Sequence, residues 1–252
     1  SAEVLGMLTG GVVLLACLVG WELHLAEPML PMKLFTVRAF AAGNLSTLML
    51  TASLFSTVFF LAQYLQVTFG DSPLEAGVRF LPWTVTLFFV APIAGRLQDK
   101  IGPRWLISAG LTLQGSGMLW IAYNAHQHDA YSTSVAALVI SGFGTSMAMP
   151  AQQSAVMTSV PVHSMSKAGG TFSTVRQLGG ALGVSVLAAV FAANGNALSP
   201  NGFADGFSAA MVAAAVLAFA GAASGLLAPG RPRVPQAAPT TPWGTMRKEP
   251  VA

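Results

Sequence analysis

The stretch from residue 39 to residue 67 contains no charged side chain, and it limits what this chain can fold into more than any other feature. A helix rises about 1.5 Å per residue, so about 20 apolar residues cross the hydrocarbon core of a bilayer. A membrane barrel would instead need runs of about 10 residues that alternate apolar and polar. The apolar run here is continuous and longer, so it predicts a membrane-spanning helix.

Six further segments are long and apolar enough to span a bilayer, which predicts an all-α membrane protein with seven transmembrane helices. They cover residues 4–21, 77–97, 104–123, 135–157, 169–193 and 206–227. The composition agrees, because 8% of the 252 residues are charged, against about 25% in soluble domains. Small residues spaced by three and four within 169–183 predict close helix packing. The single Cys17 excludes an internal disulfide framework.

A short basic turn separates two of the long apolar runs. Gly102 and Pro103 are expected to end one helix and to start the next, Gly95 to allow close helix approach, and Asp99 to accept hydrogen bonds at a helix N-terminus. The pattern resembles the loop signature of the major facilitator superfamily, which implies a conformational-switch loop carried by Gly95, Asp99, Lys100, Gly102 and Arg104. The alternative is a merely basic cytoplasmic loop.

The distribution of positive charge predicts the orientation. With this turn in the cytoplasm, the expected outer loops 67–76, 124–134 and 194–205 contain no Lys or Arg, and the C-terminus is cytoplasmic. Ten of the twelve cations then lie on the cytoplasmic side, namely Lys33, Arg38, Arg96, Lys100, Arg104, Lys167, Arg231, Arg233, Arg247 and Lys248.

Three further stretches resemble the branch of that superfamily with fourteen helices, which consists largely of drug:proton antiporters. They are residues 70–77, the pair Leu81-Pro82, and residues 176–183. The resemblance implies a six-helix C-terminal transporter half, built as two inverted three-helix repeats over residues 39–228. An extra transmembrane helix over 1–22 and a cytoplasmic linker over 23–38 would precede it, and a disordered cytoplasmic tail over 229–252 would follow.

The resemblance also implies a function. The chain would be the C-terminal half of a proton-coupled multidrug or small-molecule efflux antiporter, working by alternating access in a bacterial plasma membrane. Its partners would be membrane lipids, a hydrophobic substrate, protons and an N-terminal half that carries the coupling acids; we expect the sequence to begin within a longer protein. An oligomeric seven-helix channel or membrane scaffold is the alternative. No catalytic motif, cofactor site or nucleic-acid-binding pattern is evident, so an enzyme is not expected.

Arg176 lies well inside a predicted span, where an ionised side chain must face protein or water rather than lipid. It is either a cavity-lining cation or a structural arginine whose side chain reaches the cytoplasmic surface. Family geometry implies that residues 39–67 and 135–157 line a central cavity, which adds Ser53, Phe55, Phe59, Thr145, Met149 and Gln152 as candidates. His126 and His128 are weak metal candidates, because no third ligand is evident, and no metal site is expected.

Overall fold

The computed structural model describes residues 32–127, 131–196 and 199–228, together with scattered helical residues between 10 and 21. Every regular element in these ranges is a helix, which confirms the all-α class. Most of the predicted span over 4–21, the first part of the predicted linker and the predicted tail from 229 onward lie outside the described residues. The elements are η1 (Met32–Thr36), α2 (Arg38–Phe69), α3 (Pro73–Arg79), α4 (Leu81–Ile101), α5 (Pro103–His126), α6 (Tyr131–Thr158), η2 (Val162–Ser164), α7 (Met165–Asn194) and α8 (Pro200–Gly225).

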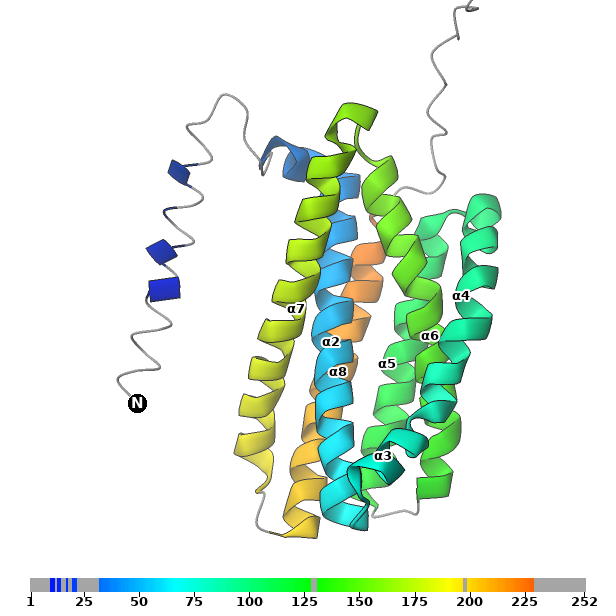
Figure 1. Ribbon diagram of the computed structural model, residues 1–252, viewed down its shortest axis with the longest axis vertical. Helices are drawn as coiled ribbons and strands as arrows, with labels where there is room; N and C mark the ends of the chain where they lie inside the picture. The colour runs from blue at the N-terminus through cyan, green and yellow to red at the C-terminus, as the bar shows by residue number, and fades with distance from the viewer. Residues whose placement is uncertain are drawn as a thin grey trace, which may run out of the picture.

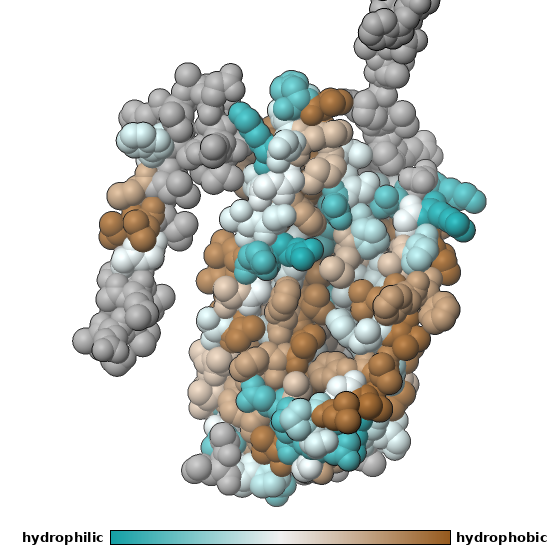
Figure 2. Space-filling model, in the orientation of Figure 1, coloured by the Kyte–Doolittle hydropathy of each residue, from teal (hydrophilic) through white to brown (hydrophobic). Residues whose placement is uncertain are grey.

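Four helical stretches of the described chain are long and apolar enough to cross a membrane: α2, α6, α8 and the continuous Val162–Asn194. The pair α3 and α4 adds a fifth if its bend of 42° is counted within one span. α5 has 24 residues but is less apolar, because its buried face carries Ser108, Gly110 and Gln114. Figure 2 shows brown and pale side chains over the middle of the bundle, with more teal at its two ends.

The helices form two groups of three that pack in equivalent ways. Exchanging α2 with α6, α4 with α7 and α5 with α8 preserves the main neighbours: α4 packs on α6 as α7 packs on α2, and α5 packs on α6 as α8 packs on α2. α5 and α8 pack on each other across the line between the groups. Figure 1 shows α2, α7 and α8 on one side and α4, α5 and α6 on the other. The exchange relates α2, α4 and α5 to α6, α7 and α8, as expected of two three-helix repeats that follow one another in the chain, and each packed group combines helices of both repeats.

Small residues allow the closest helix crossings. A Cβ atom added to Gly110 of α5 would lie 2.6 Å from the carbonyl oxygen of Gly144 in α6, and one added to Gly179 of α7 would lie 2.6 Å from the Leu48 carbonyl oxygen in α2. No larger side chain fits such contacts, so the predicted close packing within 169–183 is confirmed at Gly179. At Gly170 no such neighbour lies within 4 Å among the described residues.

The expected outer loop over residues 67–76 contains the end of α2, a turn and the start of a helix. Gly70, with φ of +71°, ends α2, and Ser72 begins α3 with a capping box. The Ser72 amide donates to Glu75 Oε2 at 2.8 Å, and the Glu75 amide donates to Ser72 Oγ at 3.3 Å. These bonds satisfy amides that a helix start leaves free. The chain then bends at Phe80, where one predicted span becomes the two helices α3 and α4.

The basic turn is shorter than the sequence suggests. α4 continues to Ile101 and α5 begins at Pro103, so Gly102 alone separates them, with φ of +83°. That left-handed conformation favours glycine and confirms the predicted helix break. A Cβ added at Gly95 meets nothing within 4 Å, so the close helix approach expected there is absent from the described part of the bundle. The side chain of Asp99 lies outside the described set.

Candidate functional site

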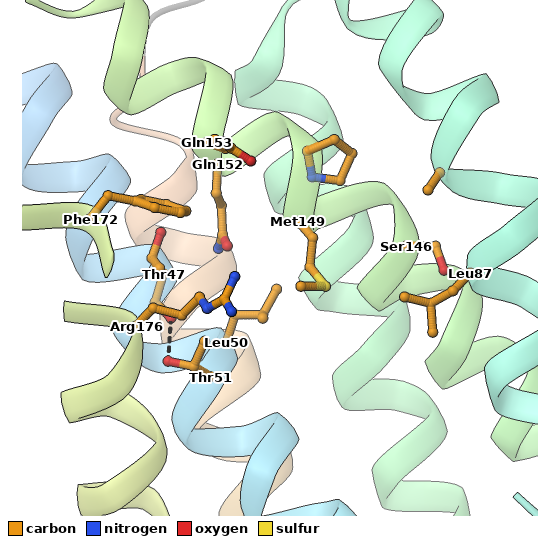
Figure 3. Close-up of a pocket in the computed structure, with 12 residues that line it drawn as sticks. Thr47, Leu50, Thr51, Leu87, Ser146, Met149, Gln152, Gln153, Phe172 and Arg176 are labelled. Atoms are coloured by element: carbon orange, nitrogen blue, oxygen red, sulfur yellow. Dashed lines mark hydrogen bonds between the residues drawn. The ribbon is translucent and has the colours of Figure 1, made fainter. Parts of the chain in front are cut away.

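A pocket of about 270 Å³ lies where α2, α4, α6 and α7 face one another. α2 and α7 belong to one group of three helices, and α4 and α6 belong to the other. The pocket therefore lies where the two groups meet. Its apolar lining consists of Leu50, Leu87, Ala91, Met149, Pro150 and Phe172. Its polar lining consists of Thr47, Thr51, Ser146, Gln152, Gln153 and Arg176, most of which are drawn in Figure 3 with their side chains around one space.

Arg176 reaches this pocket from the middle of α7. The helix begins at Met165, eleven residues earlier, which corresponds to about 16 Å of helix, or three turns. The sequence suggested about two turns, because the predicted span began at residue 169. The Arg176 side chain is exposed on this bundle, and Figure 3 shows its guanidinium pointing toward Gln152 and the pocket.

The hydroxyl groups of the pocket are already used as donors within their own helices. Thr47 donates to the Gly43 carbonyl at 2.8 Å, Thr51 to the Thr47 carbonyl at 2.9 Å, and Ser146 to the Gly142 carbonyl at 2.6 Å. Such bonds within a helix satisfy hydroxyl groups that would otherwise be unpaired in an apolar medium.

Gln152 differs from these hydroxyl groups. Its side chain is 1% exposed, and its Nε2 atom has no hydrogen-bond acceptor among the described residues. A buried amide without a partner is costly, typically about 1–3 kcal/mol, and such groups are rare in folded proteins. The pocket therefore contains an amide donor that the bundle itself does not satisfy.

The structure brings together only some of the predicted cavity residues. Met149, Gln152 and Arg176 line the pocket. Phe55 and Phe59 lie instead in a groove between α2 and α7, which also contains Gln177 and Gly180. Ser53 and Thr145 line neither space.

Ser53 and Thr145 point into the helix packing. Ser53 Oγ donates to the Ala214 carbonyl of α8 at 2.9 Å and accepts from Gln114 Nε2 of α5 at 3.3 Å. Thr145 donates to the Ser141 carbonyl of its own helix at 3.0 Å. Ser53 therefore links three helices in the interior, a role that its predicted cavity position did not suggest.

An ion pair at the α2–α3 turn was not predicted from the sequence. Arg79 Nη2 lies 3.0 Å from Asp71 Oδ1, and its guanidinium lies 5.1 Å from the ring centroid of Phe69 and 4.9 Å from that of Tyr131. The Tyr131 hydroxyl donates to the Arg79 carbonyl at 2.6 Å. The available signal was that Asp71 and Arg79 lie eight residues apart in a chain with few charges.

The expected metal candidates do not form a cluster in the part of the chain that the structure describes. His126 Nδ1 lies 3.8 Å from Asp205 Oδ1, and no group of three potential ligands is found among the described residues. His128 is outside the described ranges.

Comparison with known proteins identifies the family. The chain is 31% identical over 180 residues to the multidrug resistance protein B homolog of Mycobacterium tuberculosis, covering 70% of this chain and 33% of that protein. It is 30% identical to the methyl viologen resistance protein SmvA of Salmonella typhimurium, covering 70% of this chain and 35% of that protein. It is 27% identical to the tetracenomycin C resistance and export protein of Streptomyces glaucescens, covering 81% and 38%.

The chain thus spans about a third of the length of these relatives. The sequence model of the Major Facilitator Superfamily matches residues 43–252, a range that contains α2 from its second turn, every helix that follows and all the pocket residues. With most of its length covered by that match, this chain belongs to the major facilitator superfamily.

Proposed function

We propose that this chain forms the C-terminal six-helix bundle of a proton-coupled small-molecule exporter that works by alternating access in a bacterial plasma membrane. The observation that carries the proposal is the pocket between α2, α4, α6 and α7, where Leu50, Met149 and Phe172 surround a few polar groups. Pockets for organic molecules have this composition, and methionine adapts to ligands of different shape. The resistance and export activities named for the relatives support the same assignment.

The proposal requires a second helical body opposite the pocket. In the most apolar 18-residue segment of Val162–Asn194, which contains α7, only 17% of the residues are buried within the bundle. The corresponding share is 50–56% for α2, α6 and α8. On α4, Phe88, Phe89 and Ile93 are 63–76% exposed. We expect an N-terminal bundle of the same superfamily to cover part of this surface and lipid to cover the rest. The two bundles would then rock about the pocket.

Proton coupling would depend on that second bundle. The carboxylates whose side chains are described lie near helix ends: Asp71 and Glu75 at the start of α3, and Asp205 within the first two turns of α8. A group that exchanges protons with a transported molecule must lie within the membrane. We therefore expect the coupling acid to be contributed by the N-terminal bundle.

Reconstitution tests the proposal directly. Residues 1–252 are incorporated into proteoliposomes alone and together with the N-terminal bundle that the proposal requires, and the movement of a fluorescent amphiphilic dye is followed after a pH gradient is imposed. We expect transport only with both bundles, and we expect Ala91→Trp, which fills the pocket from α4, to abolish it. Transport by residues 1–252 alone would contradict the proposed division of roles, and full transport by the Ala91→Trp variant would contradict the pocket as the substrate path.

A further inference from the structure

Two donors without acceptors face the same pocket. Gln152 Nε2 is buried without a partner, whereas the Arg176 side chain is exposed on this bundle and forms no hydrogen bond or ion pair with the part of the chain that the structure describes. Both side chains line the pocket, and in Figure 3 their ends approach one another from α6 and α7.

Among the described residues, the bundle supplies no hydrogen-bond acceptor for Gln152 Nε2 or Arg176. Thr47, Thr51 and Ser146 donate to carbonyls of their own helices and keep lone pairs, but neither Gln152 Nε2 nor Arg176 donates to them in the described part of the chain. No carboxylate lines the pocket among the described residues, and Asp71, the most buried of the described carboxylates, is paired with Arg79. An exposed guanidinium without a protein partner, beside a buried unpaired amide, makes a site with excess positive charge and excess donors, which favours an anionic acceptor.

The rest of the pocket fixes the kind of molecule that would bring that acceptor. Leu50 and Phe172 are buried beside the two donors, and Met149 lies on the opposite wall. A ligand that uses all of these groups has an apolar body and one acidic end. The planar guanidinium suits a carboxylate, because it can donate two parallel hydrogen bonds.

We propose that Arg176 and Gln152 form the anion-binding part of the pocket and select amphiphilic organic acids; the inference rests on the proposed function of the pocket as the substrate path. The carboxylate accepts from the guanidinium and from Gln152 Nε2, and the apolar body lies against Leu50, Met149 and Phe172. Lipophilic cations are disfavoured at this position, because Arg176 repels them. The phosphate headgroup of an acidic lipid has the same acceptor chemistry and is the second possible source of the anion.

Binding to the full chain in phosphatidylcholine nanodiscs tests the proposal with two probes that share one apolar body. The probes are 1-pyrenebutyrate and 1-pyrenebutanol, and binding is followed by pyrene fluorescence. The wild type is expected to bind the butyrate at least tenfold more tightly than the alcohol. Arg176→Gln should weaken butyrate binding roughly ten- to hundred-fold, the usual effect of losing a hydrogen bond to a charged group, and should leave alcohol binding unchanged.

Two further variants make the test specific. Arg38→Gln removes the same charge from the exposed start of α2, so it controls for net charge and should change neither affinity. Gln152→Glu supplies an internal carboxylate for Arg176 and should abolish the preference for the butyrate. Equal binding of both probes by the wild type, or an equal loss of butyrate affinity in Arg38→Gln and Arg176→Gln, would overturn the anion site.

The failure of this inference can be separated from failure of the proposed function. If the alcohol binds and Ala91→Trp blocks it while the wild type shows no preference for the acid, the pocket binds organic molecules but the anion site is wrong. If Ala91→Trp leaves the binding of both probes intact, the pocket itself is not the binding site and both proposals fail. Adding phosphatidylglycerol to the nanodiscs identifies the source of the anion: competition that requires Arg176 indicates a lipid headgroup, and unchanged affinity indicates a free acid.

Discussion

Arg79 and Arg176 are both cations on helices that meet the membrane, yet their environments are opposite. Arg79 has a carboxylate 3.0 Å away and two aromatic rings within about 5 Å, so its charge is neutralised inside the protein. Arg176 has no such partner among the described residues, and its exposed side chain lines a pocket. A paired arginine stabilises the fold, whereas an unpaired arginine in a cavity is suited to bind something that the fold does not provide.

The Asp71–Arg79 pair provides a prediction at the residue scale. Arg79→Ala leaves Asp71, whose side chain is 6% exposed, buried without its partner, and should lower the free energy of unfolding by roughly 2 kcal/mol, below the value for fully buried pairs because Arg79 is partly exposed. Unfolding by a denaturing detergent, followed by circular dichroism, measures the change. Leu74→Ala, at an exposed position of α3, is the control, and the double variant Asp71→Leu with Arg79→Ala should recover part of the loss. Equal stability of the Arg79→Ala and Leu74→Ala variants would exclude a stabilising ion pair.

At the scale of helices, the sequence predicts ends better than rotations. The break at Gly102 and Pro103 was predictable, because a proline after a glycine stops one helix and starts another. The direction of Ser53 was not, because α2 carries many small Ser and Thr residues and no charged side chain inside the span that would distinguish its inward face. Family geometry named α2 and α6, which contribute to this pocket together with α4 and α7, but only contacts with α5 and α8 decide that Ser53 faces the core.

The bend at Phe80 escaped prediction for a related reason. Residues 77–97 read as one apolar run, and Pro82 was expected inside a helix rather than at its second position. The capping box of Ser72 and Glu75 begins a separate helix upstream, so the run is divided by a signal that lies outside it. A similar capping pattern before a predicted span is therefore worth testing as a helix start.

A matched pair of glycine substitutions on α7 tests the packing of that helix. A Cβ on Gly183 would overlap the backbone of Ala52 in α2, whereas one on Gly170 meets no described neighbour within 4 Å. Gly183→Ala should therefore destabilise the bundle by about 2–3 kcal/mol through overpacking, while Gly170→Ala should stabilise it by up to about 1 kcal/mol through helix propensity. The same detergent unfolding assay compares them, and equal effects of the two changes would refute close α2–α7 contact in the membrane.

At the scale of the whole molecule, the expected orientation is open to a labelling test. Gln127 ends α5 and Ser166 begins α7, at opposite ends of the bundle, and both side chains are exposed. In a Cys17→Ala background, Gln127→Cys should react with an impermeant thiol reagent added outside intact cells, and Ser166→Cys should react only after the cells are opened. Since both positions are exposed, burial cannot explain a difference. The reverse pattern would invert the orientation derived from the positive charges.

The position of α8 has a consequence for how the chain is completed in the membrane. The last helix supplies the Ala214 carbonyl to Ser53 and the Ala222 carbonyl to Ser108, and it packs against both α2 and α5. Until α8 leaves the ribosome and inserts, these hydroxyls lack their native acceptors, and the early helices expose the polar groups that later become interior. We therefore expect the nascent bundle to be most open to degradation between the synthesis of α5 and that of α8.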